Sequence, residues 1–449
     1  MTSLKSIWGN LRSSFWFIPA LIVADSIVLA VALIDADSRA GQTWMARWPH
    51  LFGAGAAGAR GMLSTIAGSM MTVVGVTFSM TLITLTLASS QYTSRILRNF
   101  MRDRVTQVVL GIFAGIFTYC LVVLRTIRGG DDSAFVPSLA VTGGVVLAIG
   151  GIGVLIFFIH HIASSIQASH IIASVARETL EAIDRLFPTA LGQGPDADHD
   201  DQAAPALSER KWCIIPVKGM GYIQNVDNTA LLRLAREHKT IVRMELGVGE
   251  FAVAGTPLVS VVLESPPAKE LISGLQAAFG LSRYRTVEQD AAFGIRQIVD
   301  MALRALSPGS NDTTTGIVCV DYLRAILARL VARNIPSSPR YEEGQLRVIA
   351  SGPTFASLVA ESFDQIRASG SGNVAILVRM LDAVQTVASL TASPGRRRVL
   401  RDHAHWLAET AERTLESPRD RLQFETRHAE VRAALAAAPA STPDQPAIA

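Results

Sequence analysis

The chain has 449 residues, of which 49% are hydrophobic and only 18% are charged. Soluble domains carry about 25% charged residues, so part of this chain must face something other than water. This composition excludes a disordered or collagen-like chain, and three cysteines without metal-type spacing exclude a disulfide-rich scaffold. The net charge of +3 hides an uneven distribution, since residues 38–130 hold nine arginines and a single acid, Asp103.

Four apolar runs predict membrane-spanning helices at residues 15–34, 62–88, 105–124 and 135–159. About twenty residues are needed to cross roughly 30 Å of hydrocarbon. The first run contains Asp25, which costs about 3 kcal/mol at a helix centre, but its Leu, Ile, Val and Phe residues contribute about −6 kcal/mol and the run still inserts. The predicted fold is an integral α-helical membrane protein, with a four-span domain at 1–160 followed by a mixed α+β, mainly helical cytoplasmic domain.

Basic residues predict the orientation of the spans. Four arginines crowd the short connection between the second and third runs, at Arg95, Arg98, Arg102 and Arg104. The positive-inside rule then places this connection and both termini in the cytoplasm. The arginines are expected to contact anionic lipid headgroups, and the alternative is a basic vestibule that concentrates anions.

The second half of the chain is predicted to be mostly water-exposed. A helical extension of the fourth span occupies 161–187, a flexible acidic linker 188–210, a small β-rich unit 211–265 and a helical domain 266–437, and the tail 438–449 is disordered. Strands are expected at 212–217, 240–246, 259–263 and 346–349. Helices are expected at 228–238, 268–279, 286–306, 313–333, 354–367, 373–390, 396–416 and 418–436.

The second span carries an unusual stripe. Nine of its 27 residues are Ser or Thr, and alternating steps of three and four residues select Thr65, Gly68, Thr72, Gly75, Ser79, Leu82, Thr86 and Ser89. Such spacing keeps one helix face turned toward a neighbour. The stripe is typical either of close helix packing or of a hydrated pore in which Leu82 forms an apolar constriction.

Other candidate sites are sparse. Asp25 is the only acid within a span, and it either carries protons or ions or bonds to a hydroxyl of the second span. The loop 306–316 interrupts two helices, and Ser307, Asn311 and Asp312 are candidates for a ligand or subunit contact, although Asp312 or Asn311 can also cap the next helix. No nucleotide-binding, hydrolase or zinc-protease motif is present, so no enzyme activity, cofactor or metal is expected.

Several segments together resemble a known family. They are FWFIP at 15–19, SSQYTSRILRNF at 89–100, FIHHIA at 158–163 with SIQ at 165–167, GYIQ at 221–224, RTVEQDAAFG at 285–294 and ALSPGSND at 305–312. Their order is similar to that of the bacterial predicted membrane protein family known as domain of unknown function 2254. The resemblance implies an inner-membrane protein with a cytoplasmic C-terminal region, and it implies a proline where this chain has Thr313.

The leading hypothesis is a homo-oligomeric channel whose second span lines the axis and whose cytoplasmic domain assembles or gates it. The alternative is a non-conducting, membrane-tethered sensor or scaffold. A third hypothesis is a proton-coupled transporter that uses Asp25, although one buried charge in four spans is sparse for alternating access. The expected partners are the lipid bilayer, further copies of the chain and ions, and nucleic acid is not expected.

Overall fold

A computed structural model describes residues 16–39, 55–91, 104–128, 135–165, 167–187, 210–336, 338–342 and 344–437, with the side chains of 87–91 left out. The chain forms two compact units, Met1–His170 and Ile171–Ala449. The predicted tail and nearly all of the predicted linker lie outside the described residues, as do Arg95, Arg98 and Arg102.

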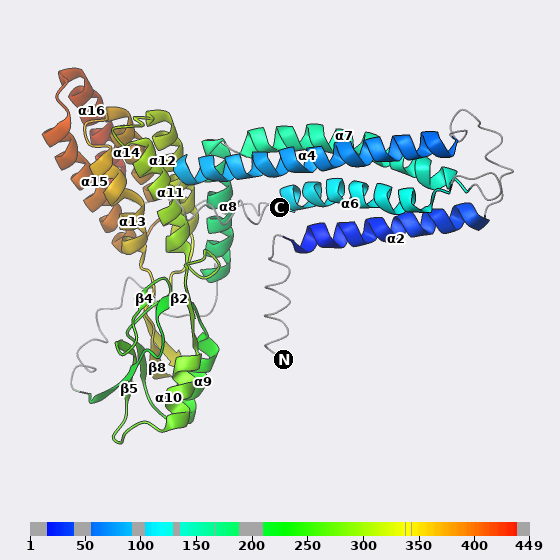
Figure 1. Ribbon diagram of the computed structural model, residues 1–449. Helices are drawn as coiled ribbons and strands as arrows, with labels where there is room; N and C mark the ends of the chain where they lie inside the picture. Colours follow the sequence, from blue (N-terminus) through cyan, green and yellow to red (C-terminus); the bar gives the residue numbers. More distant parts are fainter. Residues whose placement is uncertain are drawn as a thin grey trace. The chain divides into compact units, whose positions relative to one another are not determined.

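In the described part of the first unit, four long helices run side by side (Figure 1): α2 (Phe17–Arg39), α4 (Ala56–Gln91), α6 (Arg104–Thr126) and α7 (Ser138–Ser165). All four are long and apolar enough to cross a membrane, which confirms the four predicted spans. Their ends differ by a few residues. The helix α2 continues past the apolar run to Arg39, and α4 begins at Ala56 rather than at Met62.

The third span, α6, is the centre of this unit, because it packs against α2, α4 and α7. Two glycines allow α2 to approach closely. A methyl group built on Gly111 would lie 2.8 Å from a side-chain carbon of Ile22, and one on Gly115 would lie 2.4 Å from the Ser26 hydroxyl. Small residues four apart are a common contact between membrane helices. The tight packing inside one chain therefore involves α6 rather than the stripe of α4.

Polar side chains form hydrogen bonds with the backbone groups at the ends of these helices. The Asp37 carboxylate on α2 accepts hydrogen bonds from the backbone N–H groups of Leu139 and Ala140, each at 3.1 Å, at the start of α7. Arg60 on α4 donates to the carbonyl of Ile127, just after α6, at 2.8 Å. Helix termini leave backbone groups without partners, and in a membrane such groups cost several kcal/mol each.

The predicted extension of the fourth span is a separate helix, α8 (Ala168–Leu186), because α7 ends at Ser165. Most of α8 belongs to the second unit, whose boundary follows His170. One face of α8 is buried, and Asp184 near its end pairs with Arg329 at 2.7 Å and also with Arg333.

Two sheets form the β-rich part of the second unit. The five-stranded sheet has the order β1 (Trp212–Pro216), β5 (Pro257–Val262), β3 (Val242–Met244), β8 (Gln345–Ile349), β7 (Pro339–Glu342), and the three-stranded sheet has the order β4 (Phe251–Ala252), β2 (Gly221–Val226), β6 (Phe279–Ser282). Neighbouring strands are antiparallel except β3 and β8. Together with α9 (Asn228–Glu237) and α10 (Lys269–Ala277), the strands enclose one apolar core. The strands of these sheets extend beyond residue 265, the predicted end of the β-rich unit, because β6, β7 and β8 come later in the chain.

Six helices complete the second unit: α11 (Ala291–Ala305), α12 (Thr313–Val331), α13 (Phe355–Ser369), α14 (Val374–Ser389), α15 (Pro394–Thr414) and α16 (Pro418–Ala436). The helix α14 lies at their centre and packs against α12, α15 and α16. Each of the six begins after a residue whose side chain accepts a hydrogen bond from the first turn. Such caps contribute about 1 kcal/mol each, which explains why the sequence predicts these helices well.

Candidate functional site: the outer face of α4

One side of α4 is used for packing within the chain. Its buried residues recur mostly at helical spacing; they are Ala59, Leu63, Ala67, Met70, Thr77 and Thr84. The first four belong to the apolar core formed with α6 and α7. At about 100° per residue, the predicted stripe lies on the opposite side of the helix. All seven of its members with described side chains are exposed, namely Thr65, Gly68, Thr72, Gly75, Ser79, Leu82 and Thr86. Ser89 continues the stripe in the α4 backbone.

The threonines of the stripe donate their protons to their own helix. Thr65 bonds to the carbonyl of Gly61 at 2.8 Å, Thr72 to that of Gly68 at 3.1 Å and Thr86 to that of Leu82 at 2.9 Å. Each hydroxyl oxygen keeps lone pairs that can accept a further hydrogen bond. The stripe thus presents acceptor oxygens to whatever lies outside the chain.

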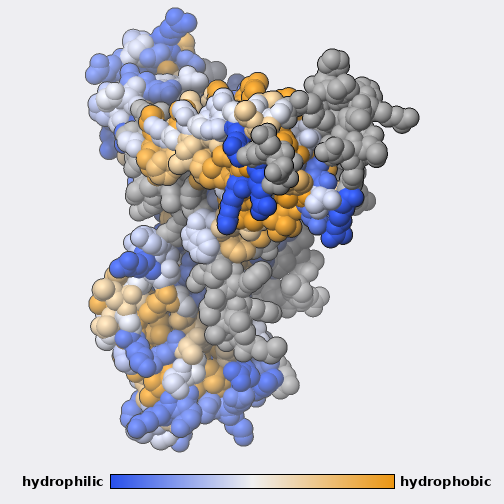
Figure 2. Space-filling model, turned by 45° about the vertical axis from the view of Figure 1, so that its right-hand side comes forward, coloured by the Kyte–Doolittle hydropathy of each residue, from blue (hydrophilic) through white to orange (hydrophobic). Residues whose placement is uncertain are grey.

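The glycines of the stripe face open space. A methyl group on Gly68 or Gly75 would meet no atom within 4 Å, so any close approach to these positions must come from outside this chain. Large exposed apolar side chains border the stripe, with Met62, Met80 and Ile83 on one side and Met71 and Phe78 on the other. Apolar surface is also exposed elsewhere on the first unit (Figure 2).

Asp25 lies on the exposed surface of α2, whose residues Ile22 and Ser26 face α6. Within the described part of the chain no hydrogen bond or ion pair engages its carboxylate, so the hydroxyl partner expected from the second span is not observed. The structure does not bring Asp25 and the stripe into one site within a chain, since α2 and α4 each pack on α6 and α7. Arg104, the first residue of α6, is the one predicted basic residue that the structure describes.

The loop before α12 is a capped turn. Asp312 caps α12 by accepting bonds from the backbone N–H and the hydroxyl of Thr315, at 3.0 and 2.6 Å. The hydroxyl bond, followed by the backbone bond, lowers the pKa of Asp312 below its usual value. Asn311 has a left-handed backbone with φ of 45°, and Ser307 bonds back to the Arg304 carbonyl. Local bonds therefore occupy Asp312 and Ser307, two of the three predicted ligand residues.

Thr313 occupies the position where the family resemblance implies proline. Its hydroxyl accepts a 2.7 Å hydrogen bond from the side-chain amide of Asn373, the residue that caps α14. The threonine thus links the starts of two helices, α12 and α14, and proline could not make this bond.

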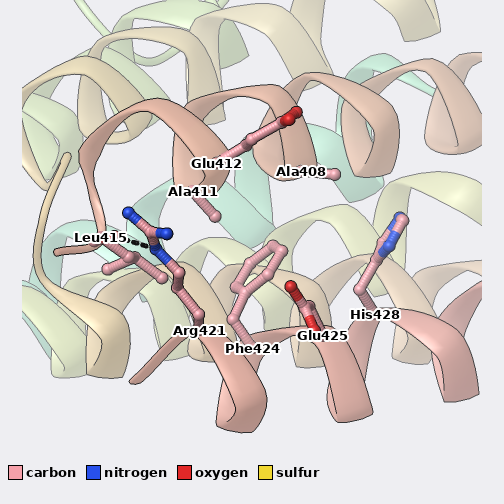
Figure 3. Close-up of a pocket in the computed structure, with 8 residues that line it drawn as sticks. All are labelled: Ala408, Ala411, Glu412, Leu415, Arg421, Phe424, Glu425 and His428. Atoms are coloured by element: carbon pink, nitrogen blue, oxygen red, sulfur yellow. Dashed lines mark hydrogen bonds between the residues drawn. The ribbon is translucent and has the colours of Figure 1, made fainter. Parts of the chain in front are cut away.

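A cavity of about 350 Å³ that the sequence does not predict lies between α15 and α16. Its lining mixes apolar and charged side chains (Figure 3): Ala408, Ala411, Glu412, Leu415, Arg421, Phe424, Glu425 and His428. His428 stacks on Phe424 with ring centroids 6.0 Å apart. Burial, with Arg432 and His405 nearby, lowers the pKa of His428. In the sequence these positions look like solvated helix faces, because the cavity arises only when the two helices pair.

The three-stranded sheet of the second unit also exposes apolar side chains. Tyr222 on β2 contacts Phe251 on β4 with ring centroids 5.0 Å apart. Met220, which immediately precedes β2, is 75% exposed, and Val253, which immediately follows β4, is 47% exposed. The sheet and the chain beside it therefore expose apolar side chains close together in the sequence.

Comparison with known proteins identifies the family. The sequence profile of a family described as predicted membrane protein (DUF2254) matches residues 12–386. The chain belongs to this family. It is also 32% identical over 424 residues to uncharacterized proteins of Mycobacterium bovis and of two strains of Mycobacterium tuberculosis, covering 93% of this chain and 80% of each relative. No solved structure is significantly similar to it.

These findings confirm the resemblance in the sequence and assign the DUF2254 protein to membranes, in agreement with its four apolar helices. The names of the mycobacterial relatives state no activity. Among the residues that the structure describes, no group of three or more His, Cys, Asp or Glu side chains could hold a metal ion.

Proposed function

We propose that this DUF2254 protein is a non-catalytic, homo-oligomeric channel of the bacterial inner membrane, in which the α4 stripes of several copies surround a central path. One observation carries the proposal. The hydroxyl and glycine side of α4 is exposed, while the opposite side packs on α6 and α7.

Lipid tails and a second helix would make different contacts with this surface. Lipid tails gain nothing from hydroxyls or glycines, whereas small residues allow two helices to approach and hydroxyl oxygens hold water. Because the threonine protons already bond to α4 carbonyls, a path between the stripes would be lined by acceptors. Acceptor oxygens suit water and cations.

The same proposal assigns the orientation. The positive-inside rule favours cytoplasmic termini, so the second unit would assemble or gate the channel from the cytoplasm. Its connection to the spans runs through α8, which follows α7 after residues 166–167.

A non-conducting, membrane-tethered scaffold is the second candidate. The exposed side chains of Phe251 on β4 and of Met220 and Val253 beside the three-stranded sheet favour it, since exposed apolar patches often mark binding surfaces. In that case α4 would still associate with other copies, but no current would flow.

Cysteine cross-linking tests the assembly on the full-length protein in membranes. Cys213 is replaced by Ser first, because Cys120 and Cys319 are buried and Cys213 is only partly so. Thr72→Cys, in the middle of the stripe, should form disulfide-linked dimers on mild oxidation. Ile152→Cys, which is 57% exposed in the middle of α7, is the matched control and should remain monomeric. Equal cross-linking of both variants, or of neither, would contradict the proposed axis.

A further inference from the structure

A groove on the first unit has an unusual lining. It lies between α6 and α7, has a volume of about 270 Å³ and is lined by Arg104, Val105, Val108, Val109, Ile112, Val154 and Phe157. Six of the seven are Val, Ile or Phe, and Arg104 is the single charged residue among them. The five α6 residues follow one helix face from its first residue onward.

Arg104 lies where a headgroup would be. It begins a helix long enough to cross a membrane, so its guanidinium lies near the boundary between hydrocarbon and headgroups. It is exposed, and no described residue forms an ion pair or hydrogen bond with it. The groove itself exposes only apolar surface, so Arg104 contributes its aliphatic stem to the lining.

We propose that this groove binds one phospholipid with an anionic headgroup, whose acyl chain lies along Val108 and Phe157 and whose phosphate pairs with Arg104. An acyl chain in the groove would make dispersion contacts with its apolar side chains, and an empty groove lacks these contacts. The guanidinium matches phosphate oxygens with two parallel hydrogen bonds.

The charge of Arg104 predicts the headgroup preference. A basic residue at an anionic membrane surface contributes about 1 kcal/mol, which corresponds to about a five-fold difference in affinity. Phosphatidylglycerol should therefore bind about five-fold tighter than phosphatidylcholine with identical acyl chains, since the choline cation offsets the phosphate charge.

The test uses the full-length protein in mild detergent, with lipid binding measured by native mass spectrometry. Wild type should retain one phosphatidylglycerol per chain in preference to phosphatidylcholine. Arg104→Gln should remove the preference while both lipids still bind, and Arg104→Lys should keep most of it. Val108→Trp should fill the groove and weaken both lipids, whereas Ile149→Trp, at a position 64% exposed on α7 and outside the groove, should weaken neither.

Three results would overturn the proposal. They are equal binding of the two lipids by wild type, an unchanged preference in Arg104→Gln, and a loss of lipid in Ile149→Trp as large as that in Val108→Trp. Glycerol phosphate without acyl chains is a further probe, and displacement of the lipid by it at equal concentration would show an anion site that does not need the groove. Should Val108→Trp fail to fold, the two Arg104 variants still decide the matter.

Discussion

Gly294 on α11 lies directly against Thr179 on α8, so that a methyl group at Gly294 would be 2.1 Å from the threonine hydroxyl oxygen. The threonine is completely buried, and its hydroxyl donates to the Val175 carbonyl at 2.7 Å. The close approach of the two helices therefore requires glycine at this position. The backbone conformation does not, because Gly294 has no positive φ. The contact fixes α8, the first helix after the spans, onto the helical part of the second unit.

Substituting Gly294 with Ala should destabilise the second unit by about 1–3 kcal/mol, the usual cost of overpacking a core. Thermal unfolding of the full-length protein in detergent measures the effect. Thr179→Ala in the same chain should recover part of the loss, because it removes the hydroxyl and methyl groups that clash. Gly309→Ala is the control, since a methyl group there meets no atom within 4 Å. If the losses of stability caused by Gly294→Ala and Thr179→Ala simply add in the double variant, the contact between the two residues is contradicted.

Arg397 should be important for the stability of the last helices. The residue is only 8% exposed, and its guanidinium donates to the carbonyls of Ala388, Ala434, Leu435 and Ala437 at 3.3, 3.0, 3.0 and 2.7 Å. It thereby caps the ends of α14 and α16 together. Arg397→Met should cost about 2 kcal/mol or more, because hydrogen bonds to charged groups are worth roughly 1.5–3 kcal/mol, and hydrogen exchange should rise at the end of α16. The exposed neighbour Arg398→Met should change neither the melting temperature nor the exchange.

A buried histidine predicts loss of stability in acid. His403 packs between Phe363 and Trp406, and burial lowers its pKa although Asp364 opposes the shift. The unfolded chain binds this proton near pH 6.5 while the folded chain does so only at lower pH. The stability contributed by neutral His403 is therefore complete above about pH 6.5 and is lost as the pH falls toward the lower pKa of the folded state.

Melting temperatures between pH 7.5 and pH 5 check this expectation. His403→Phe keeps an aromatic ring and removes the titration, so its melting temperature should fall less steeply in acid than that of wild type. Some acid sensitivity should remain, because the pKa of His428 is also lowered by burial. His238→Gln, at an exposed position, should follow the wild-type curve. Parallel curves for wild type and His403→Phe would rule out this histidine as the source.

Substitutions at Leu82 test the proposed channel directly. It is the one large aliphatic residue in the stripe and is 48% exposed, so replacing it does not disturb the packing of α4 on α6. If the stripes line a path, Leu82→Ser removes an apolar constriction that excludes water, and resting conductance in planar bilayers should rise. Leu82→Ile keeps size and apolarity and should behave as wild type. No current in either variant, with unchanged cross-linking through Thr72→Cys, would favour the scaffold instead.

The helices were largely predictable because their signals are local. Apolar runs reveal the four spans, and the pair Ser417-Pro418 marks the start of α16 at the predicted residue. The end of α2 was not predictable from hydropathy. Its last turn contains Asp35, Asp37 and Arg39, and the bonds that hold it include an ion pair between Asp35 and Arg39 and the contact of Asp37 with α7.

The sheets were less predictable because their pairing is long-range. The sequence does not predict the strands β2, β4, β6 and β7, and it predicts Phe279 at the end of a helix although this residue begins β6. The two residues of β4 carry no signal by themselves, since only pairing with β2 defines them. The lipid groove and the α15–α16 cavity have the same origin, because each arises from two helices whose mutual placement no local pattern encodes.

The bond between Asp37 and the start of α7 has a consequence for the order of biogenesis. About one hundred residues separate the donor groups from Asp37, and α2 emerges from the ribosome well before α7. Until α7 is made, the Asp37 carboxylate cannot accept hydrogen bonds from the first amides of α7. The first span therefore receives the hydrogen bonds to Asp37 only when the last span is delivered, whereas its packing against α6 is available as soon as α6 has been made.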